Sequence, residues 1–128
     1  MNNGKTIAII GASSNREKYG NMAVRAYLDQ GYTVYPVNPR GKIIEGLKCY
    51  KSILDIPDSV ETASVYLPPK LTLQVLDELS QKGVKTIFLN PGTEDEQILE
   101  KVKQLGLNAI QACSILSVGK SPAEYSGS

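Results

Sequence analysis

The chain has 128 residues, a length that fits one domain, and its 41% hydrophobic and 21% charged residues are typical of a globular protein. Its net charge of +1 gives no overall field that would indicate nucleic acid or an anionic membrane as a partner. The sequence contains no histidine, which excludes imidazole bases, imidazole metal ligands and serine–histidine or cysteine–histidine nucleophile pairs.

The first residues, MNNGK, lead directly into a strand-like segment, and no stretch approaches the roughly 20 apolar residues of a membrane span. We therefore expect a cytoplasmic protein that binds neither membrane nor nucleic acid. The two cysteines, Cys49 and Cys113, follow no spacing pattern and fit a reducing compartment. We expect neither a disulfide between them nor a metal site.

Strand and helix patterns alternate along the chain. Apolar or β-branched runs predict strands over 7–10, 33–37, 61–67, 84–89 and 107–112. Between them, periodic apolar residues predict helices that end near Gly31, Gly83 and Gly106, and a short helix is expected near 51–55. This alternation predicts an α/β, doubly wound, Rossmann-like open parallel sheet of about five strands with helices on both faces. We expect one domain over 1–119 and a polar, flexible tail over 120–128.

In such a sheet, ligands bind beyond the carboxyl ends of the strands, which selects the loops 11–20, 38–42, 67–70 and 90–93. In loop 11–20, Gly11 leaves a buried strand, and Ala12, Ser13 and Ser14 let backbone N–H groups approach an anion. Gly20 lies where the next helix begins, and a helix N-terminus favours negative charge. A tight turn without a ligand is the alternative, but the sequence favours a phosphate site.

This loop does not follow the dinucleotide fingerprint G-x-G-x-x-G, because Ser13 occupies the place of the second glycine. The end of the second strand carries Asn38 where an acidic residue would grip a ribose diol. A nicotinamide cofactor bound in the standard way is therefore disfavoured. Arg40 and Lys42 suit a further phosphate, and the 2′-phosphate of NADP stays open.

Loop 67–70 carries Pro68 and Pro69, which would fix an extended backbone without a helix start and present a rigid wall to a flat purine. The alternative is that the prolines only end the strand and start a helix. Tyr66 and Lys70 have the Y-x-x-x-K spacing of short-chain dehydrogenases, but the prolines between them make the match accidental.

Loop 90–93 is expected to be a turn in which Thr93 caps the next helix and forms a capping box with Glu96. The acids at 94–96 fit a helix start better than catalysis, and they would repel phosphate. The anion is therefore expected on the side of 11–20 and 38–42. Basic residues fall on the ligand-edge loops at Arg16, Lys18, Arg40, Lys42 and Lys70. Cys113 follows the last strand, and a buried structural role is favoured over a reactive thiolate.

The segments GASSNREKYG, VYPVNPRGKIIEGLKCYKSILDIP, YLPPK and LNPGTEDE, in this order, resemble the small stand-alone CoA-binding proteins. Those proteins are similar to the N-terminal CoA-binding domain of the succinyl-CoA synthetase α subunit. The likeness covers about residues 5 to 119. It implies coenzyme A or an acyl-CoA as the ligand, with the site residues Gly11, Ala12, Ser13, Ser14, Lys18, Tyr19, Gly20, Asn38, Pro39, Arg40, Lys42, Leu67, Pro68, Pro69, Asn90, Pro91 and Gly92.

The synthetase works through a phosphorylated histidine in a further domain, whereas this chain has no histidine. The resemblance therefore implies CoA binding and does not imply a reaction, so a carrier, sensor or partner module is favoured. An NAD(P)-binding oxidoreductase-like domain and a protein-interaction domain without a ligand stay open as alternatives. A protein partner or a homo-oligomer is also open.

Overall fold

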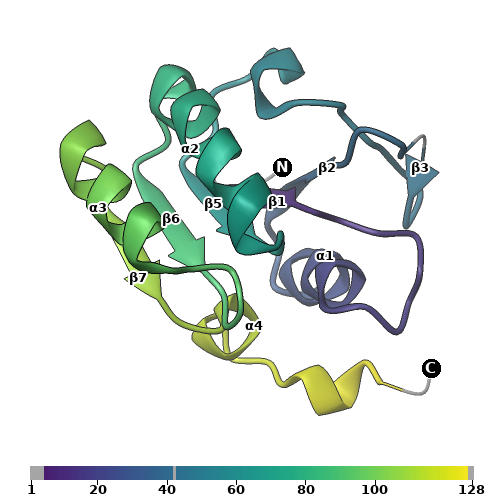
Figure 1. Ribbon diagram of the computed structural model, residues 1–128. Coiled ribbons are helices and arrows are strands. Elements are labelled where there is room, and N and C mark those ends of the chain that lie inside the picture. Colours follow the sequence, from purple (N-terminus) through teal and green to yellow (C-terminus); the bar gives the residue numbers. More distant parts are fainter. Residues whose placement is uncertain (1–4, 42, 127–128) are drawn as a thin grey trace.

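The computed structural model describes residues 5–41 and 43–126. One parallel sheet forms the centre of the molecule, with its five strands in the order β2–β1–β5–β6–β7 (Figure 1). The strands are β1 (Thr6–Ile10), β2 (Thr33–Val37), β5 (Thr62–Val65), β6 (Thr86–Leu89) and β7 (Ala109–Gln111). The doubly wound α/β fold expected from the sequence is thereby confirmed.

Helices cover both faces of the sheet. One face carries α1 (Tyr19–Asp29) and the short α4 (Ser114–Ser117), and the other carries α2 (Pro69–Lys82), α3 (Glu96–Leu105) and the 3-10 turn η1 (Ile53–Asp55) (Figure 1). Alternate residues of β1 supply the two cores: Ile7 and Ile9 pack towards α1, and Ala8 and Ile10 towards α2. Because β1 is covered on both faces, its sequence is a continuous apolar run.

The strand order reverses at β1, which pairs with β2 on one side and with β5 on the other. The chain therefore leaves β1 towards α1 and leaves β5 towards α2, on opposite faces of the sheet. Two connections that diverge from neighbouring strands leave a crevice beyond the carboxyl ends. The fold thus places an opening between the segment after β1 and the segment after β5.

A short hairpin lies between β2 and η1, in a stretch for which the sequence predicts no strand. Strands β3 (Ile43–Ile44) and β4 (Leu47–Lys48) pair in antiparallel fashion. Their turn residues, Glu45 and Gly46, have φ angles of 50° and 76°, and two positive φ angles are characteristic of the tight turns that match the twist of a hairpin. Strands of two residues give no alternation long enough to predict them.

The predicted start of one helix is wrong, and for a second helix the alternative left open by the sequence is confirmed. Asp95, and not Thr93, caps α3, because its carboxylate accepts a hydrogen bond from the Ile98 N–H at 2.9 Å. The Thr93 hydroxyl instead donates to the carbonyl of Asn90 at 2.7 Å. The segment 67–70 does start a helix, since Pro69 is the first residue of α2, a position where a missing N–H costs nothing.

The C-terminal segment also differs from the expected flexible tail. Residues Pro122–Glu124 form a 3-10 turn, η2, capped by Ser121. Tyr125 is only 7% exposed, and its hydroxyl donates to Asp29 in α1 at 2.7 Å. Residues 127–128 lie outside the described residues. None of the described helices has the length and apolar character needed to cross a bilayer.

Candidate ligand-binding cleft

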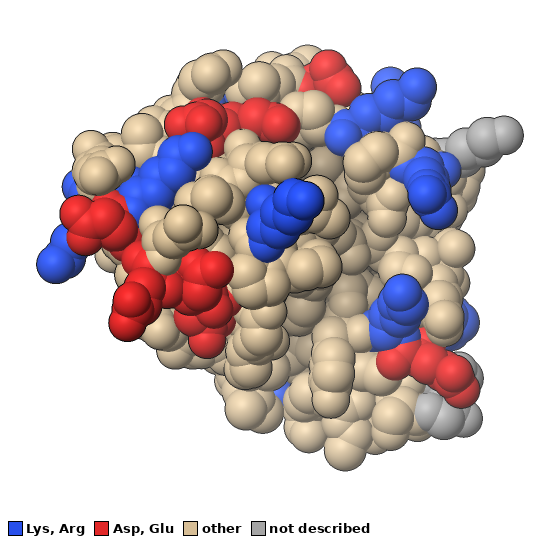
Figure 2. Space-filling model, in the orientation of Figure 1, with Lys and Arg blue, Asp and Glu red and all other residues tan. Residues whose placement is uncertain are grey.

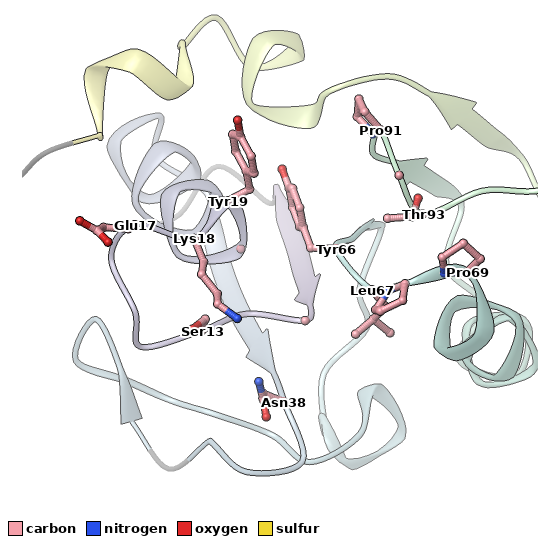
Figure 3. A pocket seen from close by; sticks show the side chains of 14 residues that line it. Ser13, Glu17, Lys18, Tyr19, Asn38, Tyr66, Leu67, Pro69, Pro91 and Thr93 are labelled. Atoms are coloured by element: carbon pink, nitrogen blue, oxygen red, sulfur yellow. The ribbon is translucent and has the colours of Figure 1, made fainter.

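A cleft of about 750 Å³ opens beyond the carboxyl ends of the strands. All the loops selected from the sequence contribute to it, and Figure 3 shows their side chains around one hollow. Eleven of the predicted site residues line it: Gly11, Ser13, Lys18, Tyr19, Gly20, Asn38, Leu67, Pro68, Pro69, Pro91 and Gly92. The other lining residues are Glu17, Tyr66 and Thr93.

The floor of the cleft depends on a close approach that only glycine permits. Gly11 has a φ of +90°, and a β-carbon at this position would lie 2.6 Å from the carbonyl oxygen of Tyr66. A β-carbon at Gly20 would overlap the carbonyl oxygen of Gly11. The N-terminus of α1 therefore rests directly on the backbone that leaves β1. Helix N–H groups and dipole are brought to the edge of the cleft in this way.

The loop between these glycines presents backbone donors. The N–H groups of Gly11 and Ala12 both donate to the carbonyl of Val37, at 3.0 and 3.2 Å, and the Ala12 side chain is fully buried. Ala12 therefore supports the loop from behind, in contrast to its predicted place beside the anion. Within the described residues, the N–H groups of Ser13 and Ser14 have no protein acceptor. These donors can meet an anion.

Asn38, after β2, connects the second loop to the first. Its side-chain amide donates to the carbonyl of Ala12 at 2.7 Å, and its side-chain oxygen accepts the N–H of Arg40 at 2.8 Å. Arg40 and Ser14 line a neighbouring hollow of about 300 Å³, which shares Ser13 and Asn38 with the cleft. Pro39 lines neither hollow among the described contacts, and the predicted site residue Lys42 lies outside the described residues.

Of the predicted basic residues, only Lys18 lines the main cleft in the described part of the chain. Figure 3 shows the Lys18 ammonium pointing towards Ser13, while Glu17 points away from the cleft. Arg16 forms an ion pair with Glu45 at 2.9 Å, and Lys70 lies in the first turn of α2. In Figure 2 this face is hollowed between α1 and α2, and acidic side chains gather over α3, to one side. The cleft therefore combines one inward cation with backbone donors.

Leu67, Pro68 and Pro69 form the opposite wall, and Figure 3 shows Leu67 and Pro69 across the cleft from Lys18. The prolines start α2 and also line the cleft, and a purine against this wall stays a prediction. Apolar side chains here leave a surface suited to a flat or aliphatic group, while polar donors occupy the facing loop.

Tyr66 lines the cleft between these two sides, although the sequence drew attention to it only through an accidental motif. Its hydroxyl lies 2.9 Å from the hydroxyl of Ser114, which lies 2.6 Å from that of Ser64. Burial raises the pKa of Tyr66 to about 12, and the hydrogen bonds to the serines offset part of this rise. The side chain is therefore a neutral, fixed phenol near pH 7. Its position directly after a strand was the signal that could have identified it.

Asn90 was predicted to contact the ligand, but it is 2% exposed and does not line the cleft. Its amide donates to Ser64 and to the carbonyl of Val65, both at 2.8 Å, and its oxygen accepts the N–H of Ser114 at 2.8 Å. Asn90 therefore fixes the turn that carries Pro91 and Gly92. Thr93 also lines the cleft, held by its bond to the Asn90 carbonyl.

Neither cysteine lines the cleft. Cys49 is buried and free, and burial raises the pKa of its thiol. Cys113 is also free and half-buried, at the start of α4.

Residues 5–119 match the family described as "CoA binding domain". The α subunit of an ADP-forming acetate–CoA ligase from Pyrococcus furiosus is 36% identical over 95% of this chain, which spans 30% of that subunit. An ADP-forming acetate–CoA ligase from Methanocaldococcus jannaschii is 41% identical over 79% of this chain, which spans 15% of that protein. A conserved hypothetical protein from Pyrococcus furiosus has a similar structure, with a TM-score of 0.82 and 37% identity, and the match covers 88% of this chain and 98% of that one.

Proposed function

Because the chain belongs to the CoA-binding domain family, we propose that it binds coenzyme A or an acyl-CoA in the cleft at the carboxyl edge of its sheet. The observation that carries this proposal is the position of the donor-rich loop 11–20 opposite the wall of Leu67 and Pro69. Coenzyme A has a diphosphate, a purine and a 3′-phosphate, and the cleft together with the neighbouring hollow offers a complementary surface for each.

The diphosphate is assigned to the N–H groups of Ser13 and Ser14, with the Lys18 ammonium beside it. The adenine is assigned to the wall formed by Leu67, Pro68 and Pro69. The 3′-phosphate is assigned to Arg40, in the neighbouring hollow that shares Asn38 with the cleft, and to Lys42. In this assignment Gly11 and Gly20 act by allowing the backbone to approach the ligand, and Tyr19 flanks the entrance.

For the role of the chain we propose CoA binding without a reaction of its own, as in a carrier, a sensor or a partner module. The two curated relatives described above are ligases, and this chain spans 30% or less of their length. Its 128 residues include no histidine, so the chain has no imidazole that could carry a phosphoryl group. Its free cysteines suit a cytoplasmic location.

A thermal-unfolding panel with CoA, acetyl-CoA, NAD⁺, NADP⁺ and ATP tests the proposal. A ligand present at 100 times its Kd stabilises a protein by about 2.7 kcal/mol, which shifts the Tm of a domain of this size by several degrees. We expect CoA and acetyl-CoA to give the largest shifts. A response to NAD⁺ or NADP⁺ with none to CoA would favour the oxidoreductase-like alternative. No response to any ligand would favour an interaction domain.

A further inference from the structure

A hydrogen-bonded network of buried polar side chains supports the donor-rich loop 11–20 from the side of α1. Asn21 and Arg25 are one turn apart on α1, and they are 0% and 9% exposed. The Asn21 amide donates to the carbonyl of Ser13 at 2.9 Å and to the Glu45 carboxylate at 3.0 Å. The oxygen of the same amide accepts the Arg25 Nε–H at 2.8 Å. Each polar group of the Asn21 side chain is therefore used in one fixed orientation.

The bond from Asn21 to Ser13 determines the direction of a donor that it does not touch. A trans peptide unit is planar, so the carbonyl of Ser13 and the N–H of Ser14 point in opposite directions. Since Asn21 holds that carbonyl towards α1, the N–H of Ser14 points away from the helix. Ser13 and Ser14 line the neighbouring hollow, which joins the cleft at Ser13 and Asn38, so a diphosphate at this junction can meet the Ser14 N–H.

Arg25 extends this hydrogen-bond network to a segment a hundred positions away in the sequence. Its guanidinium donates to the carbonyl of Arg16 at 2.7 Å and to the carbonyl of Tyr125 at 3.2 Å. It also lies over the Tyr125 ring, 5.2 Å from the ring centre. Through Arg25, the C-terminal segment 121–126 is therefore connected to the far end of the loop.

Glu45 holds the loop from the other side. It lies at the tip of the β3–β4 hairpin, and its carboxylate accepts hydrogen bonds from Asn21 at 3.0 Å and from Arg16 at 2.9 Å. The loop from Ser13 to Arg16 is thus held by the helix, by the hairpin and, through Arg25, by the C-terminal segment.

On the basis of the proposed function, we propose that Asn21 and Arg25 are positioning residues that pre-orient the loop for the diphosphate of the ligand. Segment 121–126 then raises the affinity for the ligand through Arg25 without touching the ligand. Pre-orientation favours binding because an already ordered loop loses little freedom when the anion arrives.

The test is isothermal titration of CoA into full-length wild type, Asn21→Ala, Tyr125→Ala and the control Tyr27→Phe. Tyr27 lies on the same helix, and its hydroxyl donates to the Ser114 carbonyl at 2.8 Å, so the control also removes a buried hydrogen bond. We expect Asn21→Ala to weaken CoA binding about tenfold, in keeping with the loss of a buried hydrogen bond that orients the donor. Tyr125→Ala is expected to weaken it about threefold, while Tyr27→Phe leaves it within twofold.

A readout of the Ser14 N–H separates positioning from general stability. In ¹⁵N-labelled wild type, inorganic pyrophosphate should shift the Ser14 amide resonance, and in folded Asn21→Ala this shift should be at least halved. CoA affinity within twofold of wild type in Asn21→Ala and in Tyr125→Ala would overturn this inference and leave the proposed function standing. If Asn21→Ala does not fold, the CoA affinity of Tyr125→Ala alone decides whether the inference holds. A wild type that binds neither CoA nor pyrophosphate would overturn the proposed function itself.

Discussion

Gly20, at the start of α1, lies against the carbonyl oxygen of Gly11, so closely that a β-carbon at residue 20 would overlap that oxygen. Gly11 follows β1, and the contact therefore joins the exit of a central strand to the N-terminus of the helix that it leads into. The neighbour is backbone, which cannot move aside as a flexible side chain can. The distance between loop and helix is set by this contact.

We predict that Gly20→Ala lowers the free energy of unfolding by about 2 kcal/mol, as expected for overpacking, and weakens CoA binding because loop 11–20 is displaced. Gly83→Ala is the control. Gly83 caps α2 in a left-handed conformation with a φ of +78°, and its added methyl group would meet no atom within 4 Å. It should cost about 1 kcal/mol of stability and leave the CoA affinity unchanged. Urea unfolding and calorimetric titration measure the two effects, and unchanged CoA affinity in Gly20→Ala would contradict the prediction.

Lys18→Met should weaken CoA binding about tenfold, because Lys18 is the one cation that lines the main cleft within the described residues. The loss should shrink as salt is raised, since the contact is electrostatic. Lys85→Met changes an exposed lysine next to β6 and serves as the matched control. Equal affinities for the two variants across a salt series would show that the Lys18 ammonium does not meet the ligand.

Arg40→Ala should weaken the binding of CoA more than that of dephospho-CoA, because only CoA carries the 3′-phosphate assigned to the hollow beside Ser14 and Asn38. We expect a loss of about tenfold for CoA and less than twofold for dephospho-CoA. The same comparison applies to Lys42→Ala. Losses of equal size for both ligands would mean that these side chains do not meet the 3′-phosphate.

The burial of Tyr66 leads us to predict that the free energy of unfolding depends on pH. A tyrosine in the unfolded chain has a pKa of about 10, whereas burial raises the pKa of Tyr66 to about 12 in the folded protein. The stability that the neutral phenol contributes is therefore fully present below pH 10 and is lost as the pH rises towards 12, by up to roughly 3 kcal/mol.

In Tyr66→Phe the loss of stability that comes from ionisation of the Tyr66 hydroxyl should disappear. Urea unfolding between pH 8 and pH 11 should give a shallower fall for this variant than for wild type. At pH 8 the variant should be about 1 kcal/mol less stable, because the bond to Ser114 is lost. Tyr19→Phe, at a side chain that is 60% exposed, should follow wild type. If the unfolding free energy of Tyr66→Phe falls with pH as steeply as that of wild type, the assignment of this fall to Tyr66 is contradicted.

The sheet and the cleft at its carboxyl edge could be predicted because both depend on local patterns. The apolar run of β1 and the alternation of strands and helices define the topology, and the topology brings the ends of neighbouring strands together. The cap of α3 was mispredicted for a local reason. Thr93 and Asp95 both have suitable side chains, and the Thr93 hydroxyl is taken by the carbonyl of Asn90.

The support behind the cleft could not be predicted, because it depends on pairs far apart in the sequence. Asn21 meets Glu45 across a hairpin too short to show a pattern, and Arg25 meets the carbonyl of Tyr125. A polar C-terminal sequence suggests flexibility, but the packing of Tyr125 against α1 fixes the described part of this segment. Asn90 was misassigned because a polar residue at a strand end can equally face the ligand or support the turn behind it.

Calorimetric titration of the full-length protein with CoA, with NAD⁺ as the comparison, tests the central claim most directly. The account predicts saturable binding of one CoA per chain, a loss of affinity for CoA in Lys18→Met, and NAD⁺ binding at least tenfold weaker. Saturable binding of NAD⁺ together with no binding of CoA would contradict it.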